Sequence, residues 1–457
     1  MAAIETLDTR DELGAVVASA PIPALVAVWS DAGPTLVVHP CQGRRVLGRS
    51  GGGADLAIDD GLCSRRHAVV EVEGGRARIV DAGSRNGVRV GGVRRDSADL
   101  VDGTLVRIGH TIFLFVADGR ALAGGFAREG GALLGPRERA TWARIERSVT
   151  LGTHLLVRGE SGTGKELAAR AYHRAGGAGE RPFVAVNCAA VPTGVAERLL
   201  FGTQRGAYSG ASADAVGYVQ AAHGGTLFLD ELGELELEVQ AKLLRFLESG
   251  EVMPLGAVRP LRLDVRVCLA THRDLREAVL RRTFREDLYY RIAEPSVTIP
   301  PLRERRESIP WLVQDVVEAL GRRAHASFVE AVLLRRWPGN IRELRMAVRA
   351  AVGEAELAGN EVVAAGDLAA HAGVAVTGEA EGGAAVAGGG ASADGSSARG
   401  SAEERRSLGP ADDEAVRAAL ASHGGNVSQA ARALGVHRNQ VRRWLARHGA
   451  AGGEEEA

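Results

Sequence analysis

Residues 159–166 have the composition and spacing of a loop that binds nucleotide phosphates. Four residues separate Gly159 from the Gly164-Lys165 pair, as that loop requires. Lysine occurs only twice in the chain, and one of the two stands where the loop needs a compact positive charge against a phosphate. Glycines let backbone N–H groups surround phosphate oxygens at the start of a helix, whose dipole also favours an anion. The predicted nucleotide contacts are Gly159, Glu160, Ser161, Gly162, Thr163, Gly164, Lys165 and Glu166.

A second motif follows about 65 residues after this loop. Residues 227–229 are apolar and predict a buried strand, which ends in the acids Asp230 and Glu231. In this arrangement, the Walker B motif, the first acid holds Mg²⁺ and the second orients or deprotonates the attacking water. Either motif alone would also fit a glycine turn or a strand with surface acids. Together they predict a protein that binds and hydrolyses a nucleotide with Mg²⁺, with Lys165, Asp230 and Glu231 as catalytic residues.

The bulk composition excludes several classes of protein. The chain has 457 residues and a net charge of −1, so any contact with nucleic acid must come from a local basic patch. The four cysteines form no CxxC pair, which argues against a zinc site or a disulfide framework. The acidic N-terminus does not fit a signal peptide, and two prolines interrupt the apolar run 13–29. We therefore expect a cytoplasmic protein without a membrane partner.

The pattern of residues predicts a multidomain chain. Residues 23–118 alternate short apolar strands with glycine-rich turns and predict an all-β domain. Residues 133–371 alternate strand and helix patterns and predict a parallel α/β sheet with flanking helices. Residues 378–409 are rich in Gly, Ala and Ser and predict a disordered linker. Residues 410–449 regain a helical pattern and predict an all-α domain.

The central region resembles the AAA+ ATPase domain, with its helical lid, of bacterial enhancer-binding proteins, the activators of sigma-54 RNA polymerase. The resemblance implies that Asn187 contacts the Walker B glutamate and that His272 senses the γ-phosphate. It also implies that Arg342 contacts the bound phosphate. Arg285 and Arg291 correspond to the arginine fingers, which reach the nucleotide of a neighbouring subunit. A finger acting in trans requires a ring, so the resemblance implies a homo-oligomer, a hexamer.

The segment 206–211 resembles the GAFTGA loop with which this family contacts sigma-54. The usual Phe and Thr are replaced by Tyr208 and Ser209, which keep an aromatic ring and a hydroxyl group. The alternative is a degenerate loop that no longer touches sigma-54. The predicted contacts are Gly206, Ala207, Tyr208, Ser209, Gly210 and Ala211.

The N-terminal region resembles the forkhead-associated (FHA) domain, a β-sandwich that binds phosphothreonine. Arginine and hydroxyl groups on its loops suit a dianion because they make charge-assisted hydrogen bonds to phosphate oxygens. The resemblance implies that Asn86 holds the peptide backbone and that His67 supports the loop, while Val88 replaces a usual Thr. The alternative is a sandwich retained only for packing. The predicted phosphothreonine-binding residues are Arg49, Ser64, Arg65, Arg85 and Asn86.

The C-terminal region resembles the Fis-type helix-turn-helix domain, which binds double-stranded DNA. Residues 410–449 contain six arginines and three acids, and the acids lie at the start of the first helix. Early positions of the second helix can read base edges or phosphates. The predicted DNA contacts are Arg438, Asn439, Gln440, Arg442 and Arg443.

Together these features predict a phosphothreonine-responsive, DNA-tethered activator that uses ATP to remodel sigma-54 polymerase. Its expected FHA partner is a phosphothreonine protein, for example a Ser/Thr kinase or its substrate. Two other interpretations remain open. One is a DNA-binding regulator that uses ATP only for assembly, without sigma-54. The other is an FHA-based signalling scaffold whose ATPase serves a non-transcriptional partner.

Overall fold

A computed structural model describes residues 20–374, apart from 153, 178 and 208–211, together with residues 413–422 and residue 434. By their contacts, residues Met1–Glu379 form one compact unit and residues Ala380–Ala457 a second. None of the helices in the described ranges is long and apolar enough to cross a membrane.

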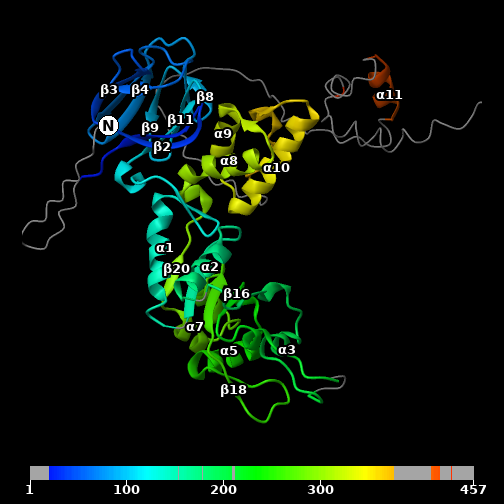
Figure 1. Cartoon of the computed structure of the whole chain (residues 1–457). Helices are drawn as coiled ribbons and strands as arrows, with labels where there is room; N and C mark the ends of the chain where they lie inside the picture. The colour runs from blue at the N-terminus through cyan, green and yellow to red at the C-terminus, as the bar shows by residue number, and fades with distance from the viewer. Residues whose placement is uncertain are drawn as a thin grey trace, which may run out of the picture. The chain divides into compact units, whose positions relative to one another are not determined.

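The N-terminal region is a sandwich of two mainly antiparallel sheets (Figure 1), in agreement with the predicted all-β domain. The first sheet has the order β2-β1-β11-β10-β7-β8, and the second has the order β4-β3-β5-β6-β9. The first comprises β1 (Ala24–Ser30), β2 (Gly33–Pro40), β7 (Val88–Val90), β8 (Val93–Arg95), β10 (Leu105–Ile108) and β11 (Thr111–Val116). The second comprises β3 (Gly43–Arg49), β4 (Leu56–Ile58), β5 (Ala68–Glu73), β6 (Arg76–Asp81) and β9 (Ser97–Leu100). Side chains such as Leu25, Leu47, Ile79 and Phe113 fill the space between the sheets.

The segment after this sandwich contains short ordered elements. These are the 3₁₀ helix η1 (Gly119–Leu122) and the antiparallel hairpin of β12 (Ala127–Glu129) and β13 (Ala132–Leu134).

The central region is built on a five-stranded sheet in the order β15-β16-β19-β14-β20. Every neighbouring pair of strands is parallel. The strands are β14 (His154–Arg158), β15 (Phe183–Asn187), β16 (Thr226–Asp230), β19 (Arg266–Thr271) and β20 (Ser296–Thr298). The surrounding helices are α1 (Pro136–Ser148), α2 (Lys165–Ala175), α3 (Ala196–Phe201), α4 (Tyr218–Ala221), α5 (Leu237–Ser249), α6 (Leu275–Leu280) and α7 (Glu286–Ile292). Shorter elements are η2 (Cys188–Ala190), η3 (Leu232–Glu234), β17 (Glu251–Val252) and β18 (Leu261–Arg262).

Alternation along the buried strands creates two apolar layers, one on each face of this sheet. In β16, Phe228 packs with α1 and α2, whereas its neighbours Leu227 and Leu229 pack with α3, α5 and α7. In β19, Cys268 packs in the same layer as Phe228, and Val267 packs in the same layer as Leu227 and Leu229. Because parallel strands end at one edge, the register places Asn187 beside Asp230. This edge is where doubly wound sheets bind their ligands.

The helical region that follows is called the lid below. It comprises η4 (Leu302–Glu304), η5 (Arg306–Ser308), α8 (Ile309–Ala319), β21 (Arg323–Ala324), α9 (Ala326–Leu333), α10 (Asn340–Leu357), β22 (Val362–Val363) and η6 (Ala365–Asp367). Trp337 and Phe328 are fully buried in its core.

In the second unit, the described helix is α11 (Asp413–Ser422), which lies in the predicted all-α region. The predicted linker 378–409 and the predicted DNA contacts Arg438, Asn439, Gln440, Arg442 and Arg443 lie outside the described residues.

Candidate functional site

The loop 159–164 joins the end of β14 to the first residue of α2, as its sequence predicts. Gly162 and Gly164 have φ angles of 76° and 104°, which favour glycine. A Cβ at Gly162 would lie 2.3 Å from the carbonyl oxygen of Gly339 in the lid, so a side chain there would separate the loop from the lid. The Lys165 ammonium donates to the carbonyl oxygens of Gly159 (3.1 Å) and Glu160 (3.3 Å). Carbonyl groups of the loop therefore bind the side chain of the loop's own lysine.

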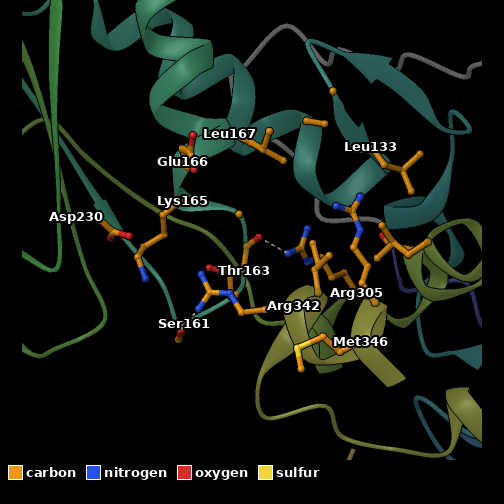
Figure 2. Close-up of a pocket in the computed structure, with 18 of the residues that line it drawn as sticks. Leu133, Ser161, Thr163, Lys165, Glu166, Leu167, Asp230, Arg305, Arg342 and Met346 are labelled. Atoms are coloured by element: carbon orange, nitrogen blue, oxygen red, sulfur yellow. Dashed lines mark hydrogen bonds between the residues drawn. The ribbon is translucent and has the colours of Figure 1, made fainter. Parts of the chain in front are cut away.

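A cavity of about 480 Å³ lies against this loop (Figure 2). Its walls include the predicted residues Lys165, Asn187, Asp230, Glu231 and Arg342, which come from the start of α2, from the ends of β15 and β16, and from the lid. Apolar side chains from the segment before α1 and from the lid complete it. These are Leu133 from that segment and Leu312, Ile341 and Met346 from the lid, together with Trp142 of α1.

The two acids of the Walker B motif have different environments. Burial raises the pKa of Asp230, and Lys165 only partly offsets that effect. Burial also acts to raise the pKa of Glu231, but hydrogen bonding to His272 and the charge of Lys165 outweigh it, so this pKa is lowered. The His272 Nδ1 lies 2.5 Å from Glu231 Oε2, and the Lys165 Nζ lies 3.6 Å from Glu231 Oε1. At neutral pH Glu231 is therefore an ionised carboxylate, as a proton acceptor must be.

Asn187 lines the cavity, but its side-chain oxygen accepts a hydrogen bond from the backbone N–H of Ala189 at 3.0 Å. The expected contact of Asn187 with Glu231 thus stays a prediction for another nucleotide state. Glu166 also lines the cavity, and its carboxylate pairs with Arg170 one turn along α2.

Lid residues hold the loop from the other side. Arg342 donates to the Ser161 hydroxyl at 3.2 Å, and Arg303 pairs with Glu160 at 2.8 Å. The hydrogen bond with Arg303 lowers the pKa of Glu160. Arg305 donates to the Thr163 carbonyl at 2.9 Å, as the dashed line in Figure 2 shows.

Arg285 and Arg291 lie on the N-terminal side of α7 and at its end, and neither lines the cavity. Arg285 pairs with Asp287 at 2.7 Å, and Arg291 donates to the Leu247 carbonyl at 2.7 Å. Within one subunit, the described structure does not bring them to Lys165 or Glu231. The role of Arg285 and Arg291 as arginine fingers stays a prediction.

The residues that flank the predicted sigma-54 loop pair with one another. Thr203 forms bridges to Ala215 and to Leu255, and the Arg205 N–H donates to Asp214 at 2.7 Å. Of the six predicted contact residues, Gly206 and Ala207 are described, and Tyr208, Ser209, Gly210 and Ala211 lie outside the described residues.

A separate cavity of about 340 Å³ lies on the N-terminal sandwich, and Arg49, Ser64, Arg85 and Asn86 line it together. The Arg85 N–H donates to the Ser64 hydroxyl at 3.2 Å, and Asn86 donates to the Leu62 carbonyl at 2.7 Å. Arg65 is not among the lining residues.

Buried His67 supports the loops of this cavity. Its Nδ1 accepts from the Ser64 N–H at 3.0 Å, and its Nε2 lies 3.1 Å from the Gly87 carbonyl. One side chain thus joins the two loops that carry the predicted phosphate contacts.

The comparisons with known proteins agree with this geometry. Residues 135–298 match the model of the sigma-54 interaction domain, and residues 303–382 match an AAA+ ATPase lid domain. The chain contains a sigma-54 interaction AAA+ domain. Residues 45–109 match the FHA domain, and residues 408–448 match the bacterial regulatory protein, Fis family. The predicted resemblance of each region to its domain family and the predicted multidomain fold class are therefore confirmed, and the match to an AAA+ ATPase lid supports ATP binding by the central domain.

Several bacterial transcriptional regulators are similar to part of the chain. The putative uric acid sigma-54-dependent transcriptional regulator UacR of Escherichia coli K12 is 45% identical over 208 residues, covering 44% of this chain and 35% of that protein. The transcriptional regulator NtrC of Azospirillum brasilense is 44% identical over 225 residues, covering 47% of each chain. The Nif-specific regulatory protein of Rhizobium leguminosarum bv. trifolii is 45% identical over 225 residues, covering 48% of this chain and 63% of that protein. The chain thus spans about a third to two thirds of these relatives.

Solved structures also resemble parts of the chain. NtrX from Brucella abortus in complex with ATP is 28% identical, with a TM-score of 0.48, covering 68% of this chain and 67% of that chain. The FHA domain of CT664 from Chlamydia trachomatis is 26% identical, with a TM-score of 0.19, covering 21% of this chain and 96% of that chain.

Sequence reasoning missed two residues that hold the sigma-54 interaction domain to its lid, Arg305 and Asn340. Asn340 is fully buried with a φ of 51°, and its side-chain oxygen accepts from the Leu302 N–H at 2.7 Å. Its amide donates to Glu160 (3.1 Å) and to the Ser161 carbonyl (3.0 Å). Its place directly after a Trp-Pro-Gly turn was the available signal, because Asn tolerates a left-handed backbone better than most residues.

We predict that Asn340→Ala destabilises the full chain by about 2–4 kcal/mol, since it leaves the buried Leu302 N–H unpaired and strains the backbone. Urea unfolding followed by circular dichroism measures this loss. Asn360→Ala, at an exposed position after α10, is the matched control. Equal stability of the two variants would contradict the assigned role.

Proposed function

We propose that this protein is a transcription activator that hydrolyses ATP in a hexameric ring and remodels sigma-54 RNA polymerase into the open complex. One observation carries the proposal. Lys165, Asp230 and Glu231 meet in one cavity, whereas Arg285 and Arg291 lie away from it in the same subunit. Such a site is incomplete until a neighbouring subunit supplies an arginine, which couples hydrolysis to ring assembly.

The residues present fit a Mg²⁺ ion. Asp230 is a half-buried carboxylate at the edge of the sheet, and its raised pKa means that a nearby divalent cation would stabilise its ionised form. Asp230 would hold the ion, which would neutralise charge on the phosphate oxygens.

The chain's own residues account for the rest of the proposed hydrolysis. Water attacks the γ-phosphorus, the bond to the β-phosphate oxygen breaks, and ADP and phosphate leave. Ionised Glu231 orients this water and accepts its proton. The Lys165 ammonium exchanges its loop carbonyls for phosphate oxygens, and Arg342 of the lid contacts the phosphates from the other side. His272, hydrogen-bonded to Glu231, reports the state of the γ-phosphate.

The segment 206–211 is the proposed sigma-54 contact. The match of residues 135–298 to the sigma-54 interaction domain supports this role, as does the bridge between Thr203 and Ala215, which lie on the two sides of the segment. The test is co-sedimentation with purified sigma-54 in the presence of ADP and aluminium fluoride, which mimics the transferring phosphate. Wild type is expected to bind, and Tyr208→Ala is expected to lose binding. Binding that persists in Tyr208→Ala would show that the loop is not the contact.

The FHA domain is the proposed sensor. Arg49, Ser64, Arg85 and Asn86 gather around one cavity, and arginine and hydroxyl groups suit a phosphate dianion. The proposed ligand is a phosphothreonine protein, such as a Ser/Thr kinase or its substrate. The Fis-type domain, with Arg438, Asn439, Gln440, Arg442 and Arg443, is proposed to bind double-stranded DNA upstream of the promoter.

We predict that Arg49→Ala weakens binding of a phosphothreonine peptide library about 10- to 100-fold, as expected for losing a charge-assisted hydrogen bond of a few kcal/mol. Fluorescence polarisation of the labelled library measures this change, with the unphosphorylated library as the reference. Arg76→Ala, at the exposed start of β6, is the control and should bind as wild type does. Equal binding of both libraries would remove phosphothreonine sensing from the proposal.

A further inference from the structure

Two strands of the FHA domain are buried on both faces. In β1, Leu25 and Ala27 face the core of the sandwich, whereas Val26 and Val28 belong to a different apolar cluster. In β11, Phe113 and Phe115 face the core, and Ile112, Leu114 and Val116 face the other way. All of these side chains are at most 6% exposed. The outer face of an antiparallel sandwich is usually polar, so this face is built to be covered.

The lid covers this face. Leu312 and Val316 of α8, and Phe328 and Val332 of α9, belong to the same cluster as Val26 and Leu114. The FHA domain and the lid therefore share one continuous apolar core. An interface that is this apolar holds two domains together as one body.

A buried carboxylate at this interface is held by two arginines of the FHA domain. Glu330 of α9 is 5% exposed, and its Oε2 lies 2.8 Å from the Arg107 Nε and 3.7 Å from the Arg89 Nε. A buried carboxylate requires such partners because its desolvation is costly. Arg89 belongs to β7, which begins two residues after Asn86 of the predicted phosphothreonine site. The phosphothreonine loop thus leads directly to the lid contact.

A second contact leads from the FHA domain to the ATP cavity. Arg306 donates to the Gly103 carbonyl of the FHA domain and to the Leu333 carbonyl of α9, both at 2.6 Å. The preceding residue, Arg305, donates to the Thr163 carbonyl of the phosphate loop and, at 3.1 Å, to buried Glu138. Of these two adjacent arginines, Arg306 therefore binds the FHA domain and Arg305 binds the phosphate loop.

We propose that the phosphothreonine site and the ATP cavity are positively coupled through this FHA–lid interface, with Arg305 and Arg306 as the connecting element. The proposal rests on the function assigned above to each site. A ligand that orders either end of a shared rigid body reduces the cost of ordering the other end. Reciprocity then requires that each ligand tightens the other by the same factor.

The first test uses the wild-type chain and needs no phosphopeptide. Hydrogen exchange is measured with and without a slowly hydrolysed ATP analogue. We expect the analogue to slow exchange in the phosphate loop and also, about 3- to 10-fold, in β1 and β11, in line with a modest coupling factor. Slower exchange in the phosphate loop with unchanged exchange in both strands would overturn the proposal.

The second test breaks the interface far from the cavity. Arg107→Gln is expected to raise the Kd of the ATP analogue about 5-fold or more, whereas Arg78→Gln, an exposed arginine of β6, should leave it unchanged. An unchanged Kd in Arg107→Gln would contradict the proposal. Should Arg107→Gln fail to fold, the exchange measurement on the wild type still decides.

A third arm separates this proposal from the assigned function of the FHA domain. Addition of the phosphothreonine peptide library to the wild type should lower the Kd of the ATP analogue, and this effect should disappear in Arg107→Gln. A library that does not bind, together with a raised Kd in Arg107→Gln, would leave the coupling in place and remove phosphothreonine as the ligand. A library that binds without changing the Kd would contradict the coupling.

Discussion

Replacing Glu231 with Gln is expected to lower kcat for ATP hydrolysis about 10³-fold, within the range for loss of a general base, while nucleotide binding changes little. Gln keeps the size of the side chain and can still meet His272 and Lys165, but it cannot accept a proton from water. The lowered pKa of Glu231 means that the wild-type carboxylate is ionised and ready for this step at neutral pH. Steady-state phosphate release and equilibrium binding of a fluorescent ATP analogue measure the two effects separately.

Glu234→Gln is the matched control for this variant. Glu234 lies three residues further along the chain in η3, and its carboxylate pairs with Arg273 rather than with Lys165 or His272. We expect it to retain hydrolysis within about threefold, as a surface ion pair contributes little. Hydrolysis by Glu231→Gln within tenfold of this control would show that another group activates the water.

Arginine-finger variants are expected to be inactive alone and active in mixtures. Arg285→Ala and Arg291→Ala should each lower kcat about 10³-fold or more, as loss of an arginine finger does. Mixing either variant with Glu231→Gln places an intact Glu231 beside an intact finger at some interfaces. In a randomly mixed ring, about a quarter of the interfaces would be complete, because the contact is head-to-tail.

The control for mixing is Arg342→Ala, which removes an arginine that lies in the same subunit's cavity. Its mixture with Glu231→Gln should stay inactive, since no interface has both an intact Arg342 and an intact Glu231 in one subunit. Two outcomes would contradict the assignment of Arg285 and Arg291 to the neighbouring subunit. One is recovery of ATP hydrolysis in this control mixture, and the other is no recovery of hydrolysis when either finger variant is mixed with Glu231→Gln.

The part of the ATP site that the sequence predicted consists of short motifs at strand ends. Lys165 and Asp230 could be placed because a glycine loop and an acid-terminated strand each have a fixed local geometry, and parallel strands bring their ends to one edge. The left-handed backbone of Glu231, with a φ of 54°, had no signal in the sequence. The lid contacts of Arg305 and Asn340 join residues 142 and 180 positions apart, so no local pattern could reveal them.

The FHA–lid interface did have a signal in the sequence. Residues 111–116 form an unbroken run of buried side chains, whereas a strand with one wet face alternates apolar and polar residues. The predicted sandwich of residues 23–118 accounts for one covered face of such a strand and does not account for the other. The identity of the partner could come only from the structure, because α8 and α9 lie about 200 positions further along the chain.

All five residues predicted to bind phosphothreonine remain predictions, and the structure does not bring all five to one cavity. Arg49, Ser64, Arg85 and Asn86 share a cavity, but Arg65 does not line it, and its carbonyl carbon and oxygen instead lie close against Gly48. The sequence alone cannot show whether Arg65 or Arg66 points into the cavity, because the direction of each side chain depends on how closely the next strand approaches the turn. The role of Arg65 stays a prediction.

The measurement that tests the central claim most directly is open-complex formation by sigma-54 polymerase on a model promoter, with the purified protein and ATP. Permanganate reactivity of the melted strands reports the result. We predict melting with wild type and none with Glu231→Gln or with Ser209→Ala. The assay should also be run with the phosphothreonine peptide library added, so that repression by the FHA domain is not mistaken for inactivity. No melting by wild type with or without the library, while ATP hydrolysis proceeds, would contradict sigma-54 remodelling and favour a DNA-binding regulator that acts without it.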